Sequence, residues 1–194
     1  MMICVTNRKL CRGDFLERIR QLAAGGADVI LLREKDLSPA AYTELAEKCL
    51  AICRESSTAL WLNSFTETAA ALQLPVQLPL SVLQKLTDAD KEKLPAIGAS
   101  VHSLGDAQLA EKLGVDWLIA GHIFATSCKP GLPPRGLDFL REICSHVSVP
   151  VYAIGGITPQ RQVRQAGASG CCVMSQMMQC PDVSAEFQNW RRMI

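Results

Sequence analysis

The sequence predicts an α/β protein, a single (β/α)8 barrel of short form that spans residues 1–194. Short apolar runs recur along the chain, and helical periodicity with helix start signals lies between most of them. Several runs are apolar almost throughout, as parallel strands buried on both faces must be. A doubly wound open sheet is the alternative, but eight strands without an internal boundary would make it unusually wide. The pattern therefore favours a closed barrel.

Eight strands are expected in chain order. They are residues 3–6, 28–33, 59–63, 75–78, 96–101, 116–121, 150–155 and 170–174. Helix starts are expected where a capping side chain precedes a periodic segment, and these caps are Asp14, Ser38, Ser103 and Thr158. Glycines before the next strand are expected to end helices in the left-handed conformation. The segment 78–95 has only an irregular helical pattern, so the helix expected there is the weakest of the set.

Composition excludes several classes of function. The chain has 194 residues, of which 48% are hydrophobic, enough to build a core without covalent staples. The net charge of +1 argues against a nucleic-acid or membrane-surface partner. No apolar run is long enough to span a bilayer, and no secretory signal is visible. We expect a soluble, cytoplasmic protein, and a homo-oligomer is left open.

The nine cysteines do not form a metal or disulfide pattern. Cys49 and Cys53 are four apart within a helical pattern, Cys171 and Cys172 are adjacent, and no C-x-x-C pair occurs. Adjacent strand residues point to opposite faces of a sheet. We expect the cysteines to be small buried hydrophobic residues in a reducing compartment.

In a barrel of this type, functional side chains lie at the carboxyl ends of the strands. Apart from Glu34 and Asp36, which share their segment with cations, these ends carry no carboxylate, whereas magnesium normally needs one or two. We therefore expect no metal and no other cofactor, and a small anionic substrate. The expected cations of the rim are Arg33, Lys35, Lys129 and Arg135, and the neutral polar side chains are Asn63, Gln77 and Ser100.

Two strand ends predict a phosphate site. Gly155 and Gly156 follow the seventh strand, and Ser175 and Gln176 follow the eighth. Glycine lets backbone N–H groups approach an oxyanion closely, and the last two loops are the usual phosphate site of such barrels. A glycine pair is equally common in tight turns, so its position after the seventh strand carries the prediction.

The segment after the sixth strand, residues 121–136, has no helical pattern and is longer than most such connections. His122 stands at its root and Lys129 near its tip. We expect His122 to be the catalytic acid and base, because its unperturbed pKa is near neutrality. His102 precedes the cap Ser103, so a structural role at the helix entry is expected, and His146 is expected at a helix end away from the rim.

Four segments contain most of these strand ends and their loops. They are REKDLSP (33–39), IGASVHSLGDAQLAEKLGVDWLIAGHIFATSCKPG (97–131), PVYAIGGITP (150–159) and VMSQM (173–177). In them the chain resembles the thiamine phosphate synthase superfamily. The segment GHIFATSCKPGLPPRG resembles the TenI-type thiazole tautomerase branch. Synthases resemble one another in aspartates after strands 3 and 4, where this chain has Asn63-Ser64 and Gln77-Leu78-Pro79.

The resemblance implies an isomerase, a cofactor-independent thiazole tautomerase of thiamin biosynthesis. It would convert 2-(2-carboxy-4-methylthiazol-5(2H)-ylidene)ethyl phosphate to its aromatic tautomer, with His122 moving the proton. The substrate would be bound by Arg33, Asn63, Gln77, Ser100, Lys129, Gly155, Gly156, Ser175 and Gln176. Two alternatives stay open: a thiamine phosphate synthase-like transferase, and a non-catalytic regulatory protein that binds a thiazole phosphate.

Overall fold

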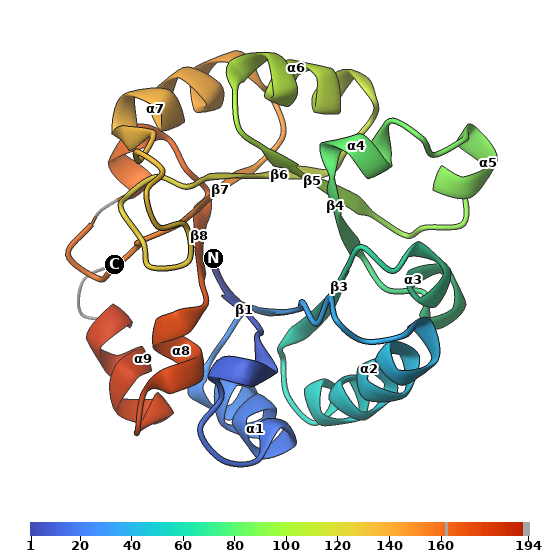
Figure 1. Ribbon diagram of the computed structural model, residues 1–194, viewed down its shortest axis with the longest axis vertical. Helices are drawn as coiled ribbons and strands as arrows, with labels where there is room; N and C mark the ends of the chain where they lie inside the picture. The colour runs from blue at the N-terminus through green and yellow to red at the C-terminus, as the bar shows by residue number, and fades with distance from the viewer. Residues whose placement is uncertain (162, 192–194) are drawn as a thin grey trace.

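The eight strands close into a parallel barrel in chain order, β1 to β8, as the sequence predicts (Figure 1). The computed structural model describes residues 1–161 and 163–191. Each strand pairs with its sequence neighbours, and β8 pairs with β1 through Met2 opposite Cys171. The strands are β1 (Met2–Val5), β2 (Val29–Leu32), β3 (Ala59–Asn63), β4 (Val76–Pro79), β5 (Ile97–Val101), β6 (Trp117–Gly121), β7 (Val151–Ile154) and β8 (Gly170–Val173).

The helices surround the barrel as an outer ring (Figure 1). Among the described residues none of them is long and apolar enough to cross a membrane. They are α1 (Phe15–Gly25), α2 (Pro39–Arg54), α3 (Thr66–Leu72), α4 (Leu80–Leu83), α5 (Asp88–Lys91), α6 (Leu104–Lys112), α7 (Gly136–His146), α8 (Ser175–Gln179) and α9 (Val183–Arg191), with 3-10 turns η1 (Arg8–Leu10) and η2 (Val163–Ala166).

Three of the predicted caps are formed. The Asp14 carboxylate accepts from the N–H of Glu17 at 2.8 Å, and the hydroxyls of Ser38 and Ser103 accept in the same way at the starts of α2 and α6. These bonds satisfy N–H groups that the first turn of a helix leaves without a partner. Local sequence thus sets where these helices begin.

The prediction of a helix that starts at Thr158 and Pro159 is wrong. A turn follows β7 instead, and the first helical residues that the structure describes after it are those of η2. The segment is short, because Gly167 with φ of 88° already turns the chain toward β8. The weakly helical stretch after β4 forms two single turns, α4 and α5, as its irregular pattern predicts.

The core has two parts, one between the strands and the helices and one inside the barrel. Alternate strand residues separate them: Ile3 and Val5 belong to the interior, whereas Met2 and Cys4 belong to the outer part. The indoles of Trp61 and Trp117 stack inside the barrel with centroids 4.0 Å apart. Large aromatic groups therefore fill the interior beneath the carboxyl ends of the strands.

Gly98 in β5 should tolerate no side chain, because a Cβ there would overlap the Trp117 indole and the Gln77 amide. We expect Gly98→Ala to lower the free energy of unfolding by about 1–3 kcal/mol, measured by urea denaturation. Gly105→Ala in α6 is the matched control, since its Cβ would meet nothing closer than the Ser103 hydroxyl at 3.8 Å. That control should stabilise the protein by about 0.5–1 kcal/mol. Equal effects at the two positions would contradict the packing argument.

Candidate functional site

Two adjoining cavities open at the carboxyl ends of the strands. The first has a volume of about 500 Å³ and lies beneath the loop between β6 and α7. The second, of about 640 Å³, lies over the ends of β2 to β5. The described residues that line both cavities are Val5, Arg33, His102, Lys129 and Ile154. The mouth of the barrel therefore offers two compartments with a common wall.

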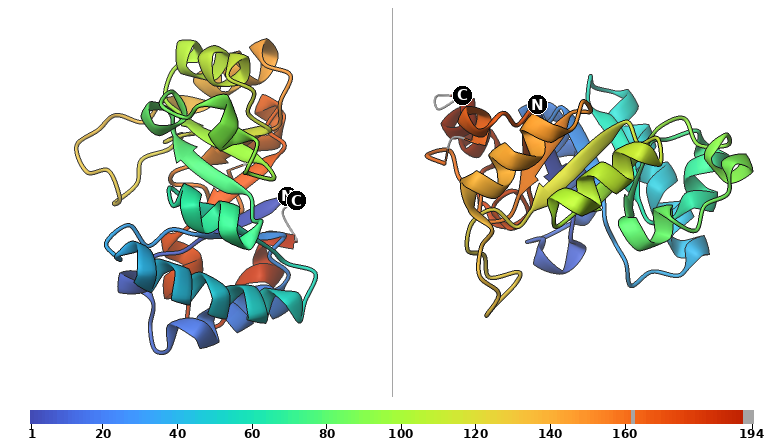
Figure 2. Two further views of the ribbon diagram at one scale, coloured as in Figure 1. Left: turned by 90° about the vertical axis from the view of Figure 1, so that its right-hand side faces the viewer. Right: turned by 90° about the horizontal axis from the view of Figure 1, so that it is seen from above.

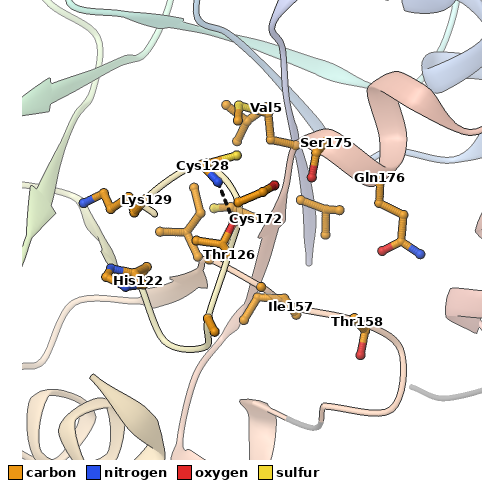
Figure 3. Close-up of a pocket in the computed structure, with 18 of the residues that line it drawn as sticks. Val5, His122, Thr126, Cys128, Lys129, Ile157, Thr158, Cys172, Ser175 and Gln176 are labelled. Atoms are coloured by element: carbon orange, nitrogen blue, oxygen red, sulfur yellow. Dashed lines mark hydrogen bonds between the residues drawn. The ribbon is translucent and has the colours of Figure 1, made fainter. Parts of the chain in front are cut away.

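Every predicted site residue lines at least one of these cavities. Figure 3 shows the first cavity, with His122 and Lys129 on one side and Ser175 and Gln176 across from them. Five of the predicted site residues line the first cavity alone: His122, Gly155, Gly156, Ser175 and Gln176. Three line the second cavity alone, namely Asn63, Gln77 and Ser100. Arg33 and Lys129 line both cavities. The Gln176 amide, however, donates to Glu186 of α9, so it is engaged within the protein.

Arg8 at η1 binds both acids of the segment that follows β2. Its guanidinium lies 3.2 Å from the Glu34 carboxylate and 2.7 Å from that of Asp36. Glu34 is 2% exposed and also accepts from the Thr6 hydroxyl at 2.7 Å. Hydrogen bonds from the side chains of Arg8 and Lys9 hold the pKa of the Asp36 carboxyl well below its usual range. Neither acid lines a cavity.

Arg33, Lys35 and Lys129 have no ion pair with any described carboxylate, although Glu34 and Asp36 stand beside two of them in the sequence. Partial burial lowers the pKa of the Lys35 ammonium, and the nearby charge of Arg33 lowers it further. The fourth expected cation, Arg135, stands at the end of the loop that follows β6 but does not face either cavity. Its Nε donates to the carbonyl of Gly121 at 3.2 Å, and it lines neither cavity.

The long loop after β6, residues 122–135, projects from the barrel (Figure 2). His122 is 6% exposed at its root, and its Nε2 lies 3.3 Å from the carbonyl of Leu132. A carbonyl can only accept, so Nε2 carries the proton, and in the neutral ring Nδ1 is the acceptor. The imidazole therefore joins the two ends of the loop and also forms part of the cavity wall.

Gly155 and Gly156 have φ of 100° and 62°, in the left-handed region that favours glycine. A Cβ on Gly155 would overlap His122, and one on Gly156 would overlap the carbonyl of Ala125. The glycine pair is thus required to pack the loop root against β7, whatever binds in the cavity. No hydrogen bond to another described residue uses the backbone N–H groups of the pair, so they remain available to a ligand.

The polar residues of the second cavity form a network with the barrel interior. The Trp117 indole donates to Gln77 Oε1 at 2.7 Å, and Gln77 Nε2 donates to the Ser100 hydroxyl at 3.0 Å. Asn63 Oδ1 accepts from Ser64 at 3.2 Å. Both amide oxygens already accept a hydrogen bond. The network holds the floor of this cavity in one arrangement.

Sequence analysis missed several residues of the cavity walls. At the start of α6 the backbone N–H of His102 donates to the Asp106 carboxylate. The side chain of His102 lines both cavities, and its Nδ1 lies 2.7 Å from the carbonyl of Gly121. Arg161 lines the first cavity and stacks over Phe124 with its guanidinium 4.7 Å from the ring centroid. Five of the nine cysteines are buried as expected, whereas Cys128 is exposed in the loop and lines the first cavity. No local pattern distinguishes these residues from surface ones.

The side chains of the mouth do not fit a magnesium ion. Of the described residues that line either cavity, Asp106 alone carries a carboxylate, and one of its oxygens accepts from the N–H of His102 at 2.9 Å. Nowhere in residues 1–161 and 163–191 do three His, Cys, Asp or Glu side chains gather as metal ligands would. Magnesium prefers several oxygen ligands in octahedral geometry.

Comparisons with known proteins give one consistent family. The family model described as thiamine monophosphate synthase matches residues 2–177. The chain is 32% identical over 198 residues to a thiamine-phosphate synthase of Syntrophomonas wolfei subsp. wolfei, covering 97% of this chain and 93% of the relative. It is 33% identical to one of Coprothermobacter proteolyticus, with 98% and 92% covered. A solved thiamine phosphate pyrophosphorylase from Pyrococcus furiosus superposes with a TM-score of 0.85 at 32% identity, covering 99% and 94%.

The expectation of an isomerase, a cofactor-independent thiazole tautomerase, is wrong. The relatives are named thiamine-phosphate synthases, which are transferases, and the solved structure is a pyrophosphorylase. The expectation gave most weight to the segment 121–136. The structure gives several features of that segment packing roles, since His122 binds Leu132 and Arg135 binds Gly121. Such features are weak evidence for a particular reaction.

Replacing Arg8 should destabilise the fold, because Glu34 would stay buried without its cation. We expect Arg8→Met to lower the free energy of unfolding by roughly 2–3 kcal/mol, measured by urea denaturation. Arg20→Met is the matched control, since Arg20 forms an exposed pair with Glu17, and it should cost less than about 1 kcal/mol. A loss no larger than that of the control would show that Glu34 does not depend on Arg8.

Proposed function

The chain belongs to the thiamine monophosphate synthase family, and we propose that it is a thiamine phosphate synthase-like transferase. It joins a thiazole phosphate to a pyrimidine that carries a diphosphate, and it releases diphosphate. The observation that supports this proposal is the pair of adjoining cavities with a common wall. Two substrates that react with each other need neighbouring compartments, whereas an isomerisation needs only one.

The thiazole phosphate occupies the first cavity in this proposal. The free N–H groups of Gly155 and Gly156 and the hydroxyl of Ser175 hold its phosphate, since all three line this cavity. Backbone N–H groups and hydroxyls bind oxyanions well where little water competes. This arrangement directs the thiazole ring toward the common wall.

The pyrimidine diphosphate occupies the second cavity. Asn63, Gln77 and Ser100 contact the ring from the floor of the barrel, and the cations of the wall face the diphosphate. The thiazole nitrogen forms a bond to the methylene carbon of the pyrimidine as the bond from that carbon to diphosphate oxygen breaks. The oxygen keeps the electron pair, and Arg33 and Lys129 stabilise the developing charge.

His122 has no proton to move in this reaction, because the thiazole nitrogen attacks with a lone pair. We assign His122 a positioning role: its bond to Leu132 keeps the loop folded so that Lys129 stays at the boundary of the two cavities. Loss of His122 should therefore lower kcat, because Lys129 would no longer be held beside the leaving diphosphate.

Incubation of the purified protein with a thiazole phosphate and a pyrimidine diphosphate tests the proposal directly. We expect thiamine phosphate and diphosphate to form in equal amounts, measured by chromatography of both products. Binding of the thiazole phosphate without formation of either product would instead indicate a non-catalytic binding protein.

Lys129→Met should lower kcat/KM of the transfer by about tenfold or more, because a charge at the boundary of the two substrates is lost. Lys48→Met is the matched control: Lys48 pairs with Glu44 on the exposed face of α2 and lines neither cavity, so the change should leave kcat/KM unchanged. Similar values for the two variants would exclude Lys129 from the site.

A further inference from the structure

The second cavity carries positive charge that the protein itself does not neutralise. Arg33, Lys35 and Lys129 all line it, and none has an ion pair with a described carboxylate. Arg8 accounts for this, since it binds both Glu34 and Asp36 and removes them from the cations beside them. Like charges placed together around a cavity favour an anion within it.

Neutral donors add to these cations. Ser81 and Gln84 of the α4 region line the same cavity, and no described residue forms a hydrogen bond with either side chain. The Ser100 hydroxyl accepts from Gln77, so its own proton is free to be donated. An anion at this place would thus meet hydroxyl and amide donors as well as charged ones.

The oxygen atoms of the same cavity are poorly suited to a divalent cation. Gln77 Oε1 accepts from the Trp117 indole, and one oxygen of Asp106 accepts from the backbone of His102. A cation bound there would also be repelled by the charges of Arg33 and Lys35, which line the same space. The donor set therefore favours an anion that arrives without a metal.

We infer that the second cavity binds a diphosphate group without a divalent metal, with Arg33, Lys35 and Lys129 supplying the positive charge. The identity of the ligand rests on the proposed function, whereas the independence of metal rests on the side chains of the cavity. Cationic side chains stabilise phosphoryl oxygens by charge-assisted hydrogen bonds in place of the ion. Partial burial lowers the pKa of the Lys35 ammonium, and the nearby charge of Arg33 lowers it further.

Calorimetric titration of the full chain with inorganic pyrophosphate, in EDTA and again in excess Mg²⁺, tests the inference. We expect binding in EDTA and no tighter binding with Mg²⁺. Lys35→Met, which alters a residue of the second cavity only, should weaken binding in EDTA by about tenfold. Lys48→Met, whose lysine pairs with Glu44, should leave it unchanged.

Three results would overturn the inference: pyrophosphate that binds only with Mg²⁺, pyrophosphate that does not bind at all, or equal affinities for Lys35→Met and the unaltered protein. The transferase assay separates this failure from that of the proposed function. Thiamine phosphate that forms only with Mg²⁺ would keep the transferase and reject the metal-free site. Metal-free pyrophosphate binding without any transfer would keep the site and reject the transferase.

Discussion

The charge of the barrel mouth depends on the contacts of Arg8 with Glu34 and Asp36. The segment after β2 alternates cation and acid, and by itself it would be nearly neutral. Arg8 is 26 residues earlier in the chain, and the pairing of β1 with β2 brings it within 3.2 Å of Glu34. Because both acids pair with Arg8, the charges of Arg33 and Lys35 in the cavity walls stay unpaired. The pairing of these charges cannot be read from the composition, and it leaves the mouth of the barrel positively charged.

The interior of the barrel supports this mouth through one chain of contacts. Trp117 stacks on Trp61 and donates to Gln77, which in turn donates to Ser100 at the rim. A tryptophan of this size fits only because Gly98 beside it has no side chain. Packing in the core therefore fixes the polar floor of the second cavity.

The loop after β6 illustrates why a sequence motif can locate a cavity correctly and still indicate the wrong reaction. His122, Gly155 and Gly156 pack the root of the loop against β7, and they do so independently of any ligand. The relatives of the same family are named as synthases, and the activity proposed for this chain is accordingly a transfer. Two cavities that meet at Arg33, His102 and Lys129 suit such a transfer better than a proton shift within one substrate.

The sequence by itself determined the barrel, its strand order, three of its helix caps and the cations at its rim. These follow from local periodicity and capping, which act between near neighbours along the chain. Only the tertiary structure decided that Arg8 binds both acids, that Arg135 binds the carbonyl of Gly121, that His102 and Arg161 line the cavity walls, and that the mouth has two cavities. Such choices depend on distances between residues far apart in sequence, and those distances exist only once the barrel has closed.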